Sequence, residues 1–436
     1  MDDFSHLEIP LEDVKAATKN FTDKPIGSGG FGVVYKGELL LPKGRRTVAF
    51  KRLDSRYGQG NVEFWKEIVM LSGLKHKNLA PLLHFCREGD ERILVYKYAS
   101  GGSLDKHLSE SSLTYLNRLN ICIGAAKGIA YLHDPKINTQ QQRVLHRDIK
   151  SSNILLDDKG TAKVSDLGLS KYGPANQERT FVVSNVVGTP GYIDPEYLET
   201  CILSKESDVY SFGVVLLEVI CGRLCYKYDK DGGLVNAWKK CCDEDRLDDI
   251  IFPDLMKQQM DQESLWTYVS IAKRCLNRNR KDRPTMAVVV KELEFALHLQ
   301  LNSEHDNADP TKMPTSYRIM EEFSHLRIGL RDLQLTTNNF SNGNRYRNND
   351  PYELPLRCVQ IYKGELSRPG GKDKVFLKRF HRSSRTENEE FWKVVSLLSK
   401  DKNSDRDPML KFCCEGDEMI LVGSSNDLEV PSELKA

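Results

Sequence analysis

The stretch His146-Arg147-Asp148-Ile149-Lys150-Ser151-Ser152-Asn153 decides the fold of this 436-residue chain. It places an acid, a lysine two residues later and an amide five residues later between an apolar helical run and the strand-like Ile154-Leu155-Leu156. Asp166-Leu167-Gly168 follows thirteen residues after Asn153. Each piece alone is common by chance, but their order and spacing together are close to diagnostic of one kind of chemistry.

That chemistry is phosphoryl transfer. Asp148 is the candidate acceptor of a substrate hydroxyl proton, and Lys150 is the candidate for neutralising charge on the transferring phosphate. Asn153 and Asp166 are the candidate Mg²⁺ ligands, because an amide and a carboxylate supply the hard oxygen donors that this ion requires. For any one of these residues alone, an ordinary role in a polar loop is the alternative.

A glycine-rich run, Gly27-Ser28-Gly29-Gly30-Phe31-Gly32-Val33-Val34, is the candidate nucleotide loop. The same G-x-G-x-x-G pattern occurs in dinucleotide-binding turns, which must open a helix. Here the glycines lead into a β-branched run that is typical of a strand. We therefore expect a hairpin folded over nucleotide phosphates, where missing side chains let backbone N–H groups approach. A purely structural glycine turn is the alternative.

With these motifs, the chain resembles a eukaryotic protein kinase and, more narrowly, the plant receptor-like kinases, with closest similarity to the malectin type. Two further runs carry the narrower resemblance: residues 148–157, and residues 188–197, which read Gly-Thr-Pro-Gly-Tyr-Ile-Asp-Pro-Glu-Tyr. The resemblance covers roughly residues 4–300. It implies ATP and Mg²⁺ as cofactors, protein Ser/Thr hydroxyls as the substrate and a membrane receptor kinase complex as a partner. Lys150 is the lysine that serine/threonine kinases have at this position.

The resemblance also assigns residues around the nucleotide. An ion pair with Glu67 would aim Lys51 at the α- and β-phosphates, with Glu63, one helical turn earlier, as the fallback partner. Tyr96 stands at the pocket-gating position, and residues 97–99 would form the hinge to adenine. The expected nucleotide-binding residues are Ile26, Gly27, Gly29, Gly32, Val34, Lys51, Glu67, Tyr96, Tyr98 and Ala99.

Residues 166–196 correspond to the activation segment of the family. Its candidate regulatory hydroxyls are Thr180, Ser184 and Thr189. We expect Ser184 to be the phosphorylated switch and Thr189 to contact the catalytic loop. Arg147, taken to be unpaired until an anion satisfies it, would bind the phosphate through charge-assisted hydrogen bonds.

Three structural roles are also expected from the resemblance. Glu196 should pair with Arg283 deep in the large lobe. Leu167 should pack where the family has phenylalanine, and His146 should be a hydrogen-bonded core residue rather than a base.

The order of strand-like and helical patterns predicts the architecture. Residues 26–98 alternate as strands around one helix over 63–71, and most of the chain from 113 to about 300 has helical periodicity. Strands followed by helices predict an α+β, bilobal protein kinase fold with the site in the cleft between the lobes. We expect a helical lead-in over 1–20, the kinase domain over 21–301 and a linker over 302–320.

The chain then repeats its own beginning. Phe323-Ser324-His325-Leu326 restates residues 4–7 after 319 residues, and Tyr362-Lys363-Gly364-Glu365 restates residues 35–38 after 327 residues, so the second copy carries eight extra residues. We expect a degenerate partial small lobe over 321–423 and a tail over 424–436.

The repeat has lost its expected nucleotide loop. Glycines 27, 29 and 32 correspond to Leu354, Leu356 and Val359, and the pairing glutamate corresponds to Val394, although Lys378 survives in the place of Lys51. This segment should not transfer phosphate. It is either a duplication remnant or a docking or autoinhibitory module.

Composition argues against several other classes of protein. A net charge of +1 gives no reason to expect nucleic acid or an anionic membrane as the main partner. The longest apolar run, 212–220, is too short to span a bilayer, and the acidic start fits neither a signal peptide nor myristoylation. Eleven cysteines without metal-site spacing indicate free thiols. We expect a cytoplasmic protein, recruited at most peripherally to the plasma membrane.

Two functional hypotheses from different classes remain open. The first is an active serine/threonine kinase that phosphorylates itself. The second is a signalling scaffold of the kinase–pseudokinase type known among plant tandem-kinase proteins, in which binding matters more than turnover. The complete set of motifs over 27–168 favours the first hypothesis, and the fused copy is the one feature that favours the second.

Overall fold

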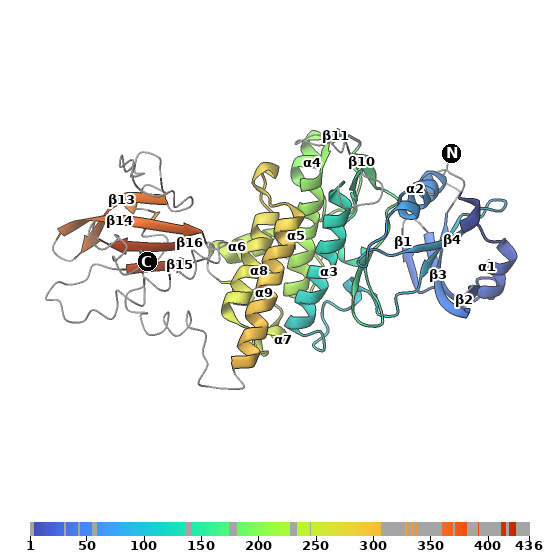
Figure 1. Ribbon diagram of the computed structural model, residues 1–436, viewed down its shortest axis with the longest axis horizontal. Helices are drawn as coiled ribbons and strands as arrows, with labels where there is room; N and C mark the ends of the chain where they lie inside the picture. Colours follow the sequence, from blue (N-terminus) through green and yellow to red (C-terminus); the bar gives the residue numbers. More distant parts are fainter. Residues whose placement is uncertain are drawn as a thin grey trace, which may run out of the picture. The chain divides into compact units, whose positions relative to one another are not determined.

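A computed structural model of the chain contains two compact units, residues 1–300 and 301–436, which are described separately (Figure 1). In the first unit, and in the helix that continues beyond it, the structure describes residues 4–29, 32–41, 44–54, 59–135, 142–173, 181–226, 233–244 and 246–306. In the second it describes residues 328, 333–334, 336–337, 340, 360–368, 371–381, 391, 411–415 and 418–423.

The small lobe of the first unit is a five-stranded antiparallel sheet in the order β1-β2-β3-β5-β4. Its strands are β1 (Gly27–Gly29), β2 (Gly32–Leu41), β3 (Gly44–Leu53), β4 (Leu82–Cys86) and β5 (Ile93–Lys97). The glycine run forms the expected β1–β2 hairpin, in which Gly27 pairs with Val34. Gly32 has φ of 137°, and a Cβ there would clash with the carbonyl oxygen of Arg52, so this position requires glycine.

Two helical segments pack on this sheet. Helix α2 (Gln59–Gly73) buries Phe64 and Ile68, and the Phe64 ring meets Phe85 of β4 edge-to-face at 5.8 Å. The lead-in, η1 (Ser5–Leu7) and α1 (Leu11–Ala17), buries Val14 in a separate apolar cluster with β2, β3 and β5. The lead-in is therefore packed on the small lobe.

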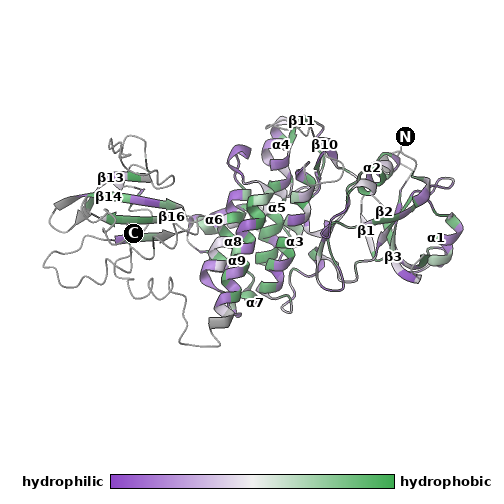
Figure 2. Cartoon of the chain, in the orientation of Figure 1, coloured by the Kyte–Doolittle hydropathy of each residue, from purple (hydrophilic) through white to green (hydrophobic). Residues whose placement is uncertain are grey.

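The large lobe is helical and is built around two buried helices, α3 (Tyr115–His133) and α5 (Lys205–Cys221). Every residue of α5 from 207 to 221 is buried, which agrees with its hydrophobic colouring in Figure 2. The other helices are α4 (Pro195–Thr200), α6 (Leu234–Asp243), α7 (Pro253–Met256), α8 (Gln262–Cys275) and α9 (Met286–Asp306). The 3₁₀ segments are η3 (Leu104–Lys106), η4 (Ser151–Asn153), η5 (Leu247–Asp249) and η6 (Arg280–Asp282).

The other strands described in the first unit are short and pair with one another. The strands are β6 (Gly102–Ser103), β7 (Arg143–Leu145), β8 (Ile154–Leu156), β9 (Ala162–Val164), β10 (Lys171–Gly173), β11 (Phe181–Val183) and β12 (Ile202–Ser204). Strands β6, β8 and β9 form one sheet, β7 pairs with β10, and β11 pairs with β12. The expected α+β fold with two lobes is confirmed. One boundary differs: α9 continues to Asp306, so the first residues of the expected linker are helical.

The second unit contains a four-stranded antiparallel sheet. Its strands are β13 (Gln360–Arg368), β14 (Gly371–His381), β15 (Lys411–Glu415) and β16 (Glu418–Gly423), in the order β13-β14-β16-β15. This is the order β2-β3-β5-β4 of the first sheet. The registers agree as well, since Lys378 pairs with Leu421 as Lys51 pairs with Leu94.

The lead-in contacts of the first unit recur in the second. Ile9 N donates to Phe85 O at 2.9 Å, and Ile328 N donates to Phe412 O at 2.9 Å. In each unit a threonine hydroxyl also closes the end of the lead-in by donating to the carbonyl oxygen four residues earlier. These bonds are Thr18 Oγ1 to Val14 O, 2.7 Å, and Thr337 Oγ1 to Leu333 O, 2.8 Å.

Each unit also has one stack of a lead-in phenylalanine, a strand tyrosine and an arginine of the next strand. The stacks are Phe21, Tyr35 and Arg52 in the first unit and Phe340, Tyr362 and Arg379 in the second. The ring centroids lie 5.1 Å and 5.3 Å apart at 63° and 67°, and the arginine Cζ lies 4.7 Å and 5.0 Å from the phenylalanine centroid. The two units therefore share side-chain geometry as well as strand order.

Several expectations about the second unit fall outside the described residues. These are the replacements for the glycines at Leu354, Leu356 and Val359, the replacement for the glutamate at Val394, and the tail over 424–436. Among the helices that the structure describes, none is both long enough and apolar enough to cross a membrane.

Candidate active site

A cleft of about 670 Å³ opens between the small and large lobes of the first unit. All ten residues expected to bind a nucleotide line it: Ile26, Gly27, Gly29, Gly32, Val34, Lys51, Glu67, Tyr96, Tyr98 and Ala99. From the large lobe, Lys150, Asn153 and Asp166 line the same cleft. The structure thus brings together groups that are up to 140 residues apart in sequence.

The cleft also has apolar walls that the motifs did not identify. Ala49, Ala80 and Leu155 line it together with Ser165. Ala49 lies two residues before Lys51 and Leu155 two residues after Asn153, and alternate residues of a strand point to the same face. The period of two would have been sufficient to predict Ala49, which shares β3 with Lys51, but not Leu155, because Asn153 precedes β8. Small and branched apolar side chains leave a flat slot suited to an aromatic base.

Lys51 forms two ion pairs within the cleft. Its Nζ lies 3.0 Å from Glu67 Oε2 and 2.7 Å from Asp166 Oδ1. Burial lowers the pKa of Lys51, but the charges of Asp166 and Glu67 outweigh burial and raise it above its ordinary value. The lysine is therefore held as a cation between α2 and the start of the activation segment.

The pKa values of the Glu67 and Asp166 carboxylates shift in opposite directions. Burial raises the pKa of Glu67 despite the nearby Lys51 charge, whereas for Asp166 burial is outweighed by Lys51 and the pKa is lowered. Tyr96 lies behind them, and burial together with the Glu67 charge raises the pKa of this phenol well above its ordinary value. Tyr96 thus remains neutral and closes the rear of the cleft.

Asp148 is buried and surrounded by donors. Lys150 Nζ lies 2.8 Å from Asp148 Oδ2, and Asn153 Nδ2 donates to the same oxygen at 3.2 Å and to the Asp148 carbonyl at 2.9 Å. Thr189 Oγ1 donates to Asp148 Oδ1 at 2.7 Å and accepts from Lys150 Nζ at 2.8 Å. These contacts fix one orientation of the carboxylate beside the lysine.

A carboxylate that the motifs missed holds the backbone of this loop. Asp208 of α5 accepts from the backbone N–H groups of His146 and Arg147, and lies 2.8 Å from His133 Nε2. Burial raises the pKa of Asp208, but the hydrogen bond and charge of His133 outweigh burial and lower it. The available signal was an acid at the start of the otherwise apolar run that forms α5.

The remaining residues of the two motifs take the expected structural positions. His146 is fully buried, with Nε2 3.0 Å from the Ser165 carbonyl. Leu167 is fully buried in the main core. Arg147 and Asp166 have φ of 73° and 67°, conformations that cost a non-glycine residue roughly 1–3 kcal/mol. Strain of this size beside the expected reaction centre is compatible with functional use of both residues.

The donor set also fits a hard divalent ion. Asn153 uses its amide nitrogen on Asp148, which leaves its amide oxygen for a metal, and Asp166 keeps a second carboxylate oxygen beside the one that Lys51 contacts. Among the residues that the structure describes, no group of three or more His, Cys, Asp or Glu side chains could hold a metal alone. An ion here would need additional oxygens from phosphate groups.

Comparison with known proteins agrees with this geometry. The family described as "Protein kinase domain" matches residues 21–294. The chain belongs to the protein kinase family. It is 43% identical over 312 residues to the receptor-like protein kinase ANXUR1 of Arabidopsis thaliana, and 42% identical over 300 residues to FERONIA of the same organism.

Those matches cover 70% and 67% of this chain but 35% and 33% of the two relatives, so the chain spans about a third of the length of these curated proteins. The receptor-like protein kinase HERK 1 of Arabidopsis thaliana is 43% identical over 306 residues, or 68% of this chain and 35% of that protein. Protein kinase domains use ATP together with a divalent metal ion.

Within this kinase domain, Arg147 is bonded without a phosphate. Its guanidinium donates to the carbonyls of Leu169 and Asn185 at 3.0 Å and 2.9 Å, and to the hydroxyls of Ser184 and Tyr197 at 3.1 Å each. The expectation of an unpaired arginine is therefore wrong. Its Nη atoms donate to neutral acceptors of the activation segment and α4, whereas its buried Nε has no hydrogen-bond partner among the described residues.

Ser184 lies in a basic pocket. Besides Arg147, Lys171 Nζ donates to Ser184 Oγ at 2.7 Å, and the serine is 7% exposed. Burial and the nearby Arg147 charge lower the pKa of Lys171. Thr180, the other expected regulatory hydroxyl in this region, lies outside the described residues.

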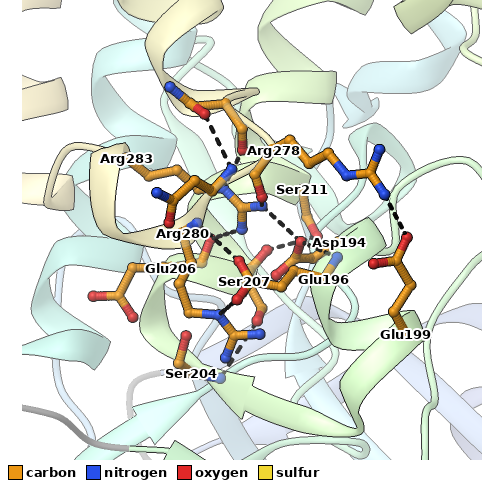
Figure 3. A network of polar contacts seen from close by, with 12 residues as sticks. Asp194, Glu196, Glu199, Ser204, Glu206, Ser207, Ser211, Arg278, Arg280 and Arg283 are labelled. Atoms are coloured by element: carbon orange, nitrogen blue, oxygen red, sulfur yellow. Dashed lines mark hydrogen bonds and ion pairs between the residues drawn. The ribbon is translucent and has the colours of Figure 1, made fainter.

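The activation segment ends in a network that differs from the expected one (Figure 3). Arg283 pairs with Asp194, not with Glu196, at 2.7 Å. Glu196 pairs with Arg280 at 2.7 Å. Asp194 directly precedes α4 and faces the interior, whereas Glu196 lies on the first turn of α4, so the arginine deepest in the lobe meets the aspartate.

Proposed function

We propose that this chain is a serine/threonine protein kinase that transfers the γ-phosphate of ATP to protein hydroxyls and phosphorylates itself. One observation carries the proposal: the paired Lys51 lines the cleft, and the donor-surrounded Asp148 is bonded to Lys150 and Asn153, which line the same cleft. The first group is suited to hold nucleotide phosphates, and the second is suited to receive a hydroxyl.

The catalytic roles follow from the contacts. Lys51, kept charged by Glu67 and Asp166, would bind the α- and β-phosphates. Asp148 would orient the substrate hydroxyl and accept its proton, and Lys150 would neutralise charge on the transferring group. Asn153 and Asp166 would hold Mg²⁺, which supplies charge neutralisation on the phosphates when bound.

The hinge and walls would bind the base and exclude water. Tyr98 and Ala99 would contact adenine at the mouth of the cleft, with Ile26 and Val34 as its roof. Tyr96, neutral and buried, would limit the depth to which a ligand can enter. Backbone N–H groups of Gly27, Gly29 and Gly32 would approach the phosphates.

The hydroxyl preference rests on Lys150 and Thr189. The Lys150 ammonium contacts both Asp148 and Thr189, so a lysine and a threonine border the aspartate where the substrate hydroxyl would bind. These neighbours support a short Ser or Thr side chain as the acceptor. Phosphoamino-acid analysis of the product distinguishes this preference from tyrosine phosphorylation.

We also propose that residues 321–423 form a second small lobe without phosphoryl-transfer chemistry, joined by a linker that ends at residue 320 to the kinase domain, whose helix α9 extends to Asp306. The shared strand order and lead-in contacts support this boundary. In the second sheet the Lys378 ammonium lies 5.0 Å from the Phe380 ring centroid, and the sequence offers neither a glycine loop nor a catalytic loop for it. A scaffold role would reside in this unit.

Regulation is proposed at the activation segment. Phosphorylation of Ser184, or failing that Thr180, in trans should raise activity, because Arg147 and Lys171 are already placed around the serine hydroxyl. Mass spectrometry after incubation with Mg·ATP, together with a double alanine variant at 180 and 184, tests this. Full activity of that variant would exclude the two hydroxyls as the switch.

The relatives, which are named receptor-like protein kinases, support a proposal for the setting in which the chain acts. We infer that the chain is of the malectin type, acts in the cytoplasm and is recruited peripherally to a receptor kinase complex at the plasma membrane. Co-purification with receptor kinases from plant membranes, compared with the chain alone, tests the recruitment. Recovery of the chain in the same fractions with and without the plant membranes would contradict the proposed recruitment.

Mg·ATP-dependent autophosphorylation of the purified chain tests the function most simply. We expect phosphate on Ser and Thr but not Tyr, requiring Mg²⁺ and absent in Lys51→Met. A folded wild-type chain that incorporated no phosphate, alone or into a general protein substrate, would favour the scaffold hypothesis.

A further inference from the structure

Three acid–arginine pairs fasten the end of the activation segment to the loop around η6 (Figure 3). Their burial differs greatly. The pairs are Asp194–Arg283 at 2.7 Å with both side chains 0% exposed, Glu196–Arg280 at 2.7 Å with 29% and 14%, and Glu199–Arg278 at 3.0 Å with 56% and 78%. An exposed pair contributes little to stability, whereas breaking a buried pair leaves an uncompensated charge in the interior.

Arg283 is the centre of the buried pair. Its other hydrogen bonds go to backbone carbonyls: Nε donates to Asn277 at 2.7 Å, Nη1 to Glu206 at 3.0 Å and Nη2 to Arg278 at 3.0 Å. These bonds hold the guanidinium against the first turn of α5. The carboxylate of Asp194 supplies its charge partner, so the position of Asp194 is fixed relative to α5.

Asp194 also lies beside the catalytic loop. Its Oδ1 accepts from Glu196 N at 3.0 Å and so caps α4, while its fully enclosed Oδ2 has no hydrogen-bond partner among the described residues. A cavity of about 10 Å³, the size of a single water molecule, is lined by Asp194, Arg147 and Asp148. The anchor and the candidate base thus line one small pocket.

The loop between Thr189 and Asp194 is held at both ends. Thr189 bonds to Asp148 and Lys150, and the middle of the loop is fixed where Ser211 Oγ donates to Tyr192 O at 2.8 Å. A shift of Asp194 would therefore move the loop that borders the position of the substrate hydroxyl. The ten residues expected to bind the nucleotide lie on other elements: on or beside the sheet, on α2 and in the hinge.

We propose that Asp194, rather than Glu196, is the positioning residue that sets the loop 189–193 against Asp148 for the protein substrate. The inference rests on the proposed kinase function for its kinetic part. Its structural part, the choice of the aspartate as the anchor, is independent of catalysis.

The test compares two isosteric variants of the full chain, Asp194→Asn and Glu196→Gln. Asp194→Asn should lower the melting temperature of the kinase domain by about 10 °C, and Glu196→Gln by only a few degrees. At a temperature well below both transitions, Asp194→Asn should reduce kcat/KM for a Ser/Thr peptide roughly ten- to a hundredfold, with the KM for ATP within about twofold of wild type.

Hydrogen–deuterium exchange provides a readout that needs no activity. Amides over 186–194 should exchange faster in Asp194→Asn and at the wild-type rate in Glu196→Gln. If Asp194→Asn does not fold, the double variant Asp194→Asn/Arg283→Met, which leaves no lone buried charge, should fold and show the same local increase.

Three results would overturn the inference: a larger effect of Glu196→Gln than of Asp194→Asn, equal losses for peptide and ATP, or unchanged exchange over 186–194. A wild-type chain that transfers no phosphate would instead refute the proposed function. The melting and exchange comparisons would still decide whether Asp194 is the anchor.

Discussion

Lys51 and Lys378 hold the same position on corresponding strands but have different neighbours. Lys51 lies between Glu67 and Asp166, whereas the ammonium of Lys378 lies over the ring of Phe380. Lys51 also lies in a cleft with the glycine hairpin and Asp166, the groups that nucleotide phosphates need beside it. The two lysines therefore provide a matched pair for testing which unit performs the chemistry.

We predict that Lys51→Met abolishes most phosphate transfer and that Lys378→Met leaves it unchanged, because only the first lysine lies in the cleft with Asp166 and the glycine hairpin. Initial rates at saturating peptide and varied ATP measure this. Equal losses from both substitutions would mean that the second unit takes part in nucleotide chemistry.

Asp208 leads to a prediction with a defined pH dependence. Its lowered pKa means that the folded state favours the charged form, so its stabilising contribution is present above the ordinary aspartate pKa of about 4 and is lost as pH falls through the lower folded value. Asp208→Asn should cost roughly 2–4 kcal/mol of unfolding free energy near neutral pH, and the difference from wild type should shrink below about pH 4.

Urea unfolding of both proteins between pH 3 and pH 7, values chosen to bracket the aspartate range, measures that difference. Asp254→Asn is the control, because the Asp254 carboxylate pairs with Lys257 at the surface of α7. A wild-type-to-variant difference that stayed constant across this range would show that Asp208 acts through shape alone.

Individual contacts show what the sequence could and could not predict at this scale. The Lys51–Glu67 pair was predictable, because both residues belong to motifs of fixed spacing. The pairing of Arg283 with Asp194 rather than Glu196 was not predictable. The two acids lie two residues apart, and the sequence does not indicate which of them faces the core. The bonded state of Arg147 depends on carbonyls about twenty to forty residues away, which no local pattern encodes.

The structure shows that the lead-in packs on the sheet of the small lobe. The protein kinase domain match begins at residue 21, yet α1 buries Val14, and Gly37 of β2 lies so close to the Ala17 carbonyl that a Cβ would clash with it. Gly364 and Thr336 are in the same close relation in the second unit. In both sheets the lead-in therefore packs against a glycine of the first long strand.

We predict that Phe21→Ala and Phe340→Ala each destabilise one unit by about 1–2 kcal/mol, since each ring packs between a tyrosine and an arginine and is partly buried. Differential scanning calorimetry of the full chain should show two transitions. Phe21→Ala should lower one of them and Phe340→Ala the other.

A single transition that both substitutions lower equally would contradict two separately folding units. Phe295→Ala is a suitable control, because that ring on α9 is 36% exposed and belongs to neither lead-in. It should leave the transition of the second unit unchanged.

At the level of elements, long segments were predictable and short ones were not. The helices now seen as α2, α3, α5, α8 and α9 are long runs that are either amphipathic or apolar throughout. Helices of four to ten residues, such as α4, α6 and α7, and three-residue strands such as β7 and β10 form through pairing with distant segments rather than through their own pattern.

At the scale of the molecule, the two compact units contain sheets with the same strand order over four strands, and the first unit adds a helical lobe to its sheet. The repeat was visible in the sequence because identical runs recur at two fixed offsets. The retention of the lead-in contacts was not visible, because it depends on rings and carbonyls that meet only in the folded sheet.

The central claim is that the kinase domain catalyses phosphate transfer through Asp148. The most direct measurement is phosphate transfer from ATP to a Ser/Thr peptide by wild type and by Asp148→Asn, with nucleotide affinity measured on the same samples. The account predicts a loss of at least about a hundredfold in turnover with folding and nucleotide affinity unchanged, because the role proposed for Asp148 is to contact the hydroxyl and not the nucleotide. Transfer by Asp148→Asn within roughly tenfold of wild type would contradict it.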